Sequence, residues 1–187
     1  MAYFKPAEQV HMQSHGRPIV AVYEMQSSDG SAGATRLYSR GIYLAKGHTI
    51  AHVAVELESN GNAGLTLDAR SLKLTAKAGD DVEPATPVGT SGPTAVPARG
   101  FGKVDAFFEL PEGTNPKSID SFEVSWQAEL GDQHTGEVTP FVRTARKGSN
   151  GLYFHGPFIP GTDVLSPWGT WFSCPDDPSY YLTPPDC

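Results

Sequence analysis

Residues 121–127 read SFEVSWQ, and the alternation in this stretch decides the fold class. Phe122, Val124 and Trp126 fall on one parity, and polar residues fall on the other. Because successive side chains of a β-strand point to opposite faces, this pattern predicts a strand with one buried face. Residues 49–58, TIAHVAVELE, alternate in the same way, so we expect an antiparallel sheet with a solvated side.

Further strand candidates lie on both sides of these stretches, and turn-rich segments separate them. The chain has 20 Gly and 16 Pro, which leave little room for long helices. We therefore predict an all-β protein, an antiparallel β-sandwich of about seven or eight strands. The other candidate strands are residues 18–25, 35–44, 65–76, 101–110 and 137–142.

Two features complicate this pattern. The apolar parity slips by one residue between Leu67 and Leu72. A bulge or corner produces such a slip, and we predict that a strand switches sheets near Arg70. Residues 77–100 are rich in Pro, Gly, Thr and Ala and poor in large apolar side chains, which predicts a long surface loop.

The chain of 187 residues is of a length that one β-sandwich with extensions accounts for. We expect an N-terminal extension at residues 1–16 and a sandwich at residues 17–147. Residues 148–187 are expected to form an irregular tail, rich in aromatic residues, Pro and Gly, that packs on the sandwich.

The order of strands and turns between Ile50 and Trp126 resembles the immunoglobulin-like β-sandwich domains of uncharacterised bacterial envelope proteins and lipoproteins, the DUF4352-like kind. One departure is that the chain has no Cys near its N-terminus for acylation. The resemblance implies an extracytoplasmic sandwich and supplies no functional residue. It rests on VAVELES (53–59), NGNAG (60–64), LTLDARSLKLTAKAG (65–79), FFELPEG (107–113) and SIDSFEVSW (118–126).

Cys174 and Cys187 flank a Pro-rich C-terminal segment, and we predict a disulfide between them. On the loop-length model this bond would remove roughly 3 kcal/mol of chain entropy from the unfolded state. Because disulfides persist in oxidising compartments, we expect a periplasmic or extracellular protein. Residues 1–10 have no apolar core of signal-peptide length, so any leader would lie outside this sequence. Two free thiols in a cytosolic protein are the alternative.

The net charge of −7 and the pI near 5.3 disfavour binding to nucleic acid or to anionic lipid, since both require a basic surface. No apolar run reaches the roughly 18 residues of a membrane-spanning helix, so we expect no transmembrane segment.

Two histidine pairs bear on metal binding. His48 and His52 lie on a predicted strand about 13 Å apart, too far for one ion, and we expect them on a polar outer face. His11 and His15 precede the first main strand, where a turn could bring both imidazoles together, and Met12 would add a soft ligand for copper or zinc. An ordinary polar leader is the alternative for this second pair.

Catalytic patterns are weak in this sequence. It has no Gly-x-Ser-x-Gly elbow, and the acidic surroundings of Cys174 would raise its pKa. We therefore predict no enzymatic activity and no cofactor.

Aromatic residues gather in the last fifth of the chain, where Trp168, Trp171, Tyr180 and Tyr181 could stack on sugars or enter a partner's pocket. Phe107 joins this set because its parity places it on the outer side of its strand. Packing against the sandwich is the alternative. Our leading hypothesis is a non-enzymatic envelope or surface domain that engages a protein partner, and the alternative is a ligand-binding module for carbohydrate or metal.

Overall fold

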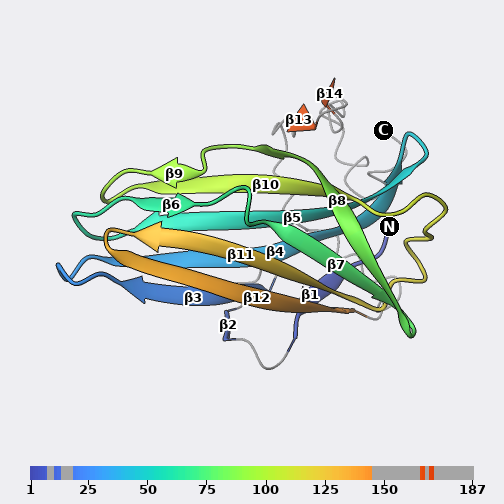
Figure 1. Cartoon of the computed structure of the whole chain (residues 1–187), viewed down its shortest axis with the longest axis horizontal. Coiled ribbons are helices and arrows are strands. Elements are labelled where there is room, and N and C mark those ends of the chain that lie inside the picture. Colours follow the sequence, from blue (N-terminus) through green and yellow to red (C-terminus); the bar gives the residue numbers. More distant parts are fainter. Residues whose placement is uncertain (8–10, 14–18, 145–164, 167–168, 171–187) are drawn as a thin grey trace, which may run out of the picture.

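The computed structural model describes residues 1–7, 11–13, 19–144, 165–166 and 169–170 (Figure 1). Its main element is a sheet of 12 strands in which all neighbours are antiparallel, and no helix occurs in these ranges. The predicted all-β, antiparallel class is confirmed. None of the described segments forms a helix of the length and hydropathy needed to cross a membrane.

The sheet folds over into two layers, here called sheet A and sheet B, and Figure 1 looks onto sheet B. Sheet A consists of β2 (Met12–Gln13), β3 (Val20–Gln26), β4 (Ala32–Ala45), β5 (His48–Ser59), β10 (Phe101–Glu109) and part of β8 (Asp81–Ser91). Sheet B consists of β1 (Phe4–Pro6), β12 (Gln133–Arg143), β11 (Ser121–Leu130), β7 (Lys73–Ala78), β6 (Leu65–Leu67), β9 (Ala95–Val96) and the rest of β8. A separate pair is formed by β13 (Leu165–Ser166) and β14 (Gly169–Thr170).

Strand β8 belongs to both layers. Its first part, through Ala85, pairs with β7, and its second part, from Thr86, pairs with β10. The predicted surface loop over residues 77–100 is therefore wrong. Most β8 side chains are exposed or half-buried, and Pro84 and Pro87 interrupt the donor row, so this strand lacks the apolar alternation of the others.

The two layers also approach each other along their far sides. Ala2 and Ile42 exchange backbone hydrogen bonds of 2.8 and 2.9 Å, and the Tyr23 hydroxyl lies 2.8 Å from Thr139 Oγ1. The result is a nearly closed, barrel-like sheet rather than a sandwich of seven or eight strands. The strand count was underestimated because short strands such as β1 and β9 carry no periodic pattern of their own.

The parity slip between Leu67 and Leu72 falls in the turn that separates β6 from β7. Both β6 and β7 pair with β11, so the chain stays in sheet B through this turn. The predicted switch between sheets near Arg70 is wrong, and the crossing lies instead in β8.

The core between the layers is formed by the parity that the sequence predicts. Phe122, Val124 and Trp126 are buried on β11, and Val53 and Val55 are buried on β5. Within sheet B, Phe122 stacks on Phe141 at 4.7 Å between ring centroids, and across the two layers Trp126 lies edge-on to Tyr23 at 4.9 Å.

Candidate functional site

Strand β12 returns from β11 through a tight hairpin. Gly131 takes a positive φ of 59°, and the loop contains only Gly131 and Asp132 between the paired residues Leu130 and Gln133. In a two-residue hairpin the closing pair is a hydrogen-bonded one. Every second residue after Gln133 therefore directs its N–H and C=O toward β11, and the residues between direct theirs to the other side.

The outward groups are those of His134, Gly136 and Val138, and they form an open strand edge. β1 pairs only with residues 141–143 of β12, and Ala7 donates to the Pro140 carbonyl at 2.9 Å. Within the described part of the chain, no strand pairs with residues 133–139 on this side. The His134 carbonyl accepts a hydrogen bond of 3.2 Å from the Gln133 side chain, which leaves three amide donors and two carbonyls directed outward.

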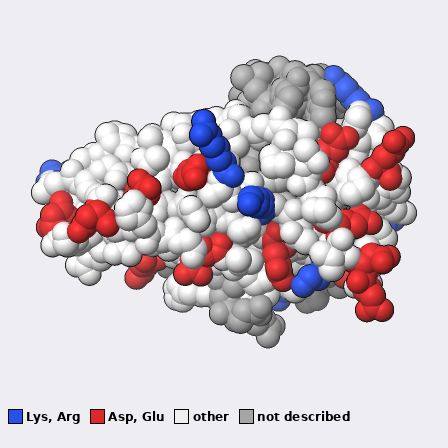
Figure 2. All heavy atoms as spheres, viewed as in Figure 1, with Lys and Arg blue, Asp and Glu red and all other residues white. Residues whose placement is uncertain are grey.

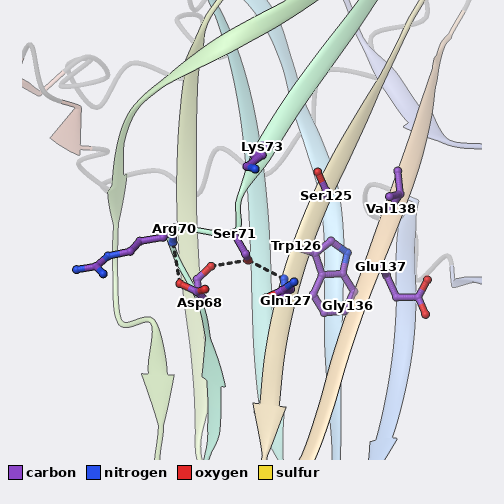
Figure 3. A pocket seen from close by; sticks show the side chains of 10 residues that line it. All are labelled: Asp68, Arg70, Ser71, Lys73, Ser125, Trp126, Gln127, Gly136, Glu137 and Val138. Atoms are coloured by element: carbon purple, nitrogen blue, oxygen red, sulfur yellow. Dashed lines mark hydrogen bonds between the residues drawn. The ribbon is translucent and has the colours of Figure 1, made fainter.

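A groove of about 690 Å³ lies on the outer face of sheet B beside this edge (Figure 3). Its base is formed by adjoining residues of β11 and β12, and one wall is the turn between β6 and β7. Because the groove and the edge share Gly136 and Val138, they form one continuous site. The lining residues are Asp68, Arg70, Ser71, Lys73, Ser125, Trp126, Gln127, Gly136, Glu137 and Val138.

The wall of the groove is held by a short hydrogen-bond network. The Gln127 N–H donates to Ser71 Oγ at 2.7 Å, and the Ser71 hydroxyl donates to the Asp68 carbonyl at 2.7 Å. The Asp68 side chain accepts from the Arg70 N–H at 2.9 Å, which closes the turn. These bonds fix the turn against β11 before any ligand is present.

The groove is open to solvent. Val138 is 54% exposed, and Gly136 presents only backbone. Trp126 is buried, with its Nε1–H donated to Thr139 at 3.0 Å, so its ring is not a stacking surface. In Figure 3, Lys73 and Glu137 lie on opposite sides of the groove and Arg70 points away from Trp126. None of the described lining residues is a His or Cys.

A second polar cluster lies on the outer face of sheet A. A bulge in β4 between Ser39 and Gly41 inserts Arg40, whose Nε is 3.1 Å from Asp105 Oδ1. His52 Nε2 donates to the same oxygen at 2.9 Å, and Lys103 Nζ is 3.5 Å from the other oxygen. One carboxylate thus holds two cations and an imidazole.

Burial controls the protonation of this cluster. It lowers the pKa of His52 to about 4, against the hydrogen bond to Asp105, which raises it. Burial by itself would raise the pKa of Asp105, but the His52 hydrogen bond and the charges of Arg40 and Lys103 outweigh it and lower this pKa. His52 is 0% exposed, and its Nδ1 has no hydrogen-bond partner among the described residues. The pair therefore resembles a catalytic His–Asp pair in its contact, but the His52 side chain is buried and that of Asp105 is only 13% exposed.

The two strand histidines have separate partners. His48 is exposed and contacts Glu109, whereas His52 is buried against Asp105. Both histidines therefore lie on the outer face of sheet A as expected, but only His48 is exposed there, because His52 is covered.

The N-terminal metal candidates are only partly described. His11 is exposed, and its carbonyl accepts from Val22 N–H at 2.9 Å. Met12 lies in β2 opposite Ala21, and His15 is outside the described residues. No group of three His, Cys, Asp or Glu side chains that could hold a metal occurs in the part of the chain that the structure describes.

Phe107 is 1% exposed and packs in a small cluster with Tyr43 and Ile50, so it offers no free aromatic face. The other aromatic candidates and the cysteines lie outside the described residues, namely Trp168, Trp171, Tyr180, Tyr181, Cys174 and Cys187. The open edge of β12 was not predicted from the sequence, because its pairing depends on strands that lie far from it in the chain.

Comparison with known proteins adds little. No protein-family model matches the chain, and no curated protein matches it. The solved structures that match include the GAE domain of yeast GGA1, at 12% identity over 66% of this chain and 98% of that chain, with a TM-score of 0.31. A likeness at this level carries no weight for fold or function.

Proposed function

We propose that this protein is a non-enzymatic interaction domain that binds an extended segment of a partner protein along the open edge of β12. The observation that carries the proposal is the row of outward backbone groups at His134, Gly136 and Val138, which adjoins a groove. A partner strand added to such an edge gains affinity from main-chain hydrogen bonds and specificity from neighbouring pockets.

The surroundings of the edge favour this mode of binding. Each new main-chain bond contributes about 1 kcal/mol, so bonds to the three amides and two carbonyls of this edge need help from side chains. Every second side chain of an added strand would lie on the outer face of sheet B, next to Val138 and the groove. Pro140 has no N–H and ends the donor row, which limits the length of strand that can be added.

Charge narrows the class of partner. The chain carries a net charge of −7, and Figure 2 shows Asp and Glu side chains spread over the viewed face, with Lys and Arg side chains between them. Partner segments with basic flanks would be attracted over a distance, which raises the association rate more than the affinity. The resemblance to immunoglobulin-like envelope domains belongs to the same proposal, and an extracytoplasmic location would follow from it.

The test uses the full chain and a display library of random linear peptides. We expect selected peptides to shift the amide resonances of His134, Gly136 and Val138 and to lose binding when Val138 is replaced by Pro. Val138→Pro removes an outward N–H and no ladder bond, as Pro140 already does at the same parity in this strand.

The matched control is Val138→Thr, which keeps the N–H and the β-branched shape and should retain binding. Peptides that bind Val138→Pro and wild type equally would overturn the proposal, as would a selection in which no peptide is enriched. Binding lost in both variants would assign recognition to the Val138 methyl groups and would also contradict strand addition.

A further inference from the structure

One part of the outer face of sheet A is buried, although no described strand layer lies over it. Tyr43, Ile50, His52 and Phe107 occupy this face, because Ala51, Val53 and Phe108, on the opposite parity, fill the core between the sheets. Their exposed fractions are 5% or less. The Arg40 side chain on the same face is 1% exposed. A sheet surface left to solvent would not show these values.

The chain leaves β12 at one border of this face. Thr144 N–H donates to the Tyr3 carbonyl at 2.9 Å, and the neighbouring Ala2 bridges to Ile42 in β4. Met1 packs directly against the cluster of Tyr43, Ile50 and Phe107. Thr144 therefore lies beside the β4 side of the buried face.

The chain reappears at the other border. Strand β13 contacts β8, which pairs with β10 at the opposite side of the same face (Figure 1). From β4 across β5 and β10 to β8 are three strand spacings, about 14 Å in all. Residues 145–164 are long enough to cross this width several times.

The sequence of this segment matches the face chemically. It contains apolar and aromatic side chains that could pack on the three rings and Ile50 of the cluster, namely Leu152, Tyr153, Phe154, Phe158 and Ile159. We propose that the C-terminal segment, from residue 145 on, packs across the outer face of sheet A and covers Tyr43, His52 and Phe107. This contact is separate from the proposed peptide site, which lies on sheet B.

Hydroxyl-radical footprinting of the full chain tests the proposal. Phe101 and Phe107 lie on the same strand and the same parity, but Phe101 is 63% exposed and Phe107 is 1% exposed. We expect Phe101 to be oxidised quickly and Phe107 and Tyr43 to be protected. Equal oxidation of Phe101 and Phe107 would overturn the proposal. Protection that disappears on dilution would also overturn it, since a second copy would then be the cover.

A variant identifies the occupant. Replacing Leu152, Tyr153 and Phe154 together by Ser should raise oxidation of Phe107 toward the rate of Phe101. Phe122 in the core should remain protected, which shows that the sheet is intact. Phe107 that stays protected in this folded variant would overturn the proposal. The equivalent change on the other face, Val138→Ser, should leave Phe107 protected, and exposure there would equally contradict the segment as the specific cover.

Discussion

His52 is held as a neutral imidazole by its surroundings. Its Nε2–H is donated to Asp105, Arg40 and Lys103 stand near the same carboxylate, and no water reaches the ring. Burial disfavours the protonated imidazole most, and the charges of Arg40 and Lys103 act in the same direction, so the pKa of His52 lies far below its ordinary value.

The shift makes stability depend on pH. Because the folded-state pKa of His52 is about 4 and the unfolded value is near 6.5, the unfolded chain binds more protons between these limits. We expect the free energy of unfolding to fall by about 3 kcal/mol from this residue as the pH drops from 7 to 4. Urea unfolding at a series of pH values measures it. His52→Gln should remove much of this slope, and an unchanged slope in that variant would contradict the assignment.

Two glycines allow the stability cost of backbone strain to be compared with that of a steric clash. Gly79 and Gly92 both have positive φ, but a Cβ at Gly92 would lie 2.1 Å from the Lys103 carbonyl oxygen, whereas one at Gly79 meets nothing within 4 Å. We expect Gly79→Ala to cost about 1 kcal/mol and Gly92→Ala about 2 kcal/mol more. Equal midpoints in thermal unfolding would show that the β8–β9 connection relaxes freely.

At the scale of elements, the turn between β6 and β7 shows how a parity slip is stabilised. Ser71 accepts from Gln127 N–H and donates to the Asp68 carbonyl, so it links the turn to β11. Ser71→Ala should cost about 1 kcal/mol and weaken peptide binding in the groove. The control is Ser118→Ala, where the hydroxyl donates only to Asn115 in an exposed turn, and it should leave both properties unchanged. Equal losses of stability and of peptide binding in the two variants would mean that the turn between β6 and β7 is not part of the binding site.

Strands with one buried face could be predicted from sequence, and strands without one could not. Residues 49–58 and 121–127 lie in β5 and β11 with the expected faces inward. β8 was missed because a strand that crosses between layers buries neither face consistently. The cluster of Arg40, His52 and Asp105 depends on the register of β4, β5 and β10. Because this register pairs residues far apart in the chain, no local sequence pattern could predict the cluster.

At the scale of the whole molecule, β1 completes the enclosure of the core. Phe4 is buried at the layer border, with its ring 5.0 Å from Phe122, and Arg143 lies 5.9 Å above it. We expect Phe4→Ala to lower the free energy of unfolding by about 3 kcal/mol. Phe101→Ala, at an exposed position, should change it by less than about 0.5 kcal/mol. Chemical denaturation of both variants measures the difference, and similar values would mean that β1 contributes little to the enclosure.

The placement of Tyr3 beside Thr144 also determines how the sheet would respond to force. The antiparallel pair β1 and β12 begins at Phe4 and Arg143, so a pull on residues 3 and 144 loads its hydrogen bonds one after another. Bonds opened in series resist weakly, whereas bonds sheared in parallel resist together. In a single-molecule stretching experiment held at these two residues, β1 would peel away at low force and leave the eleven remaining strands of the sheet to open later.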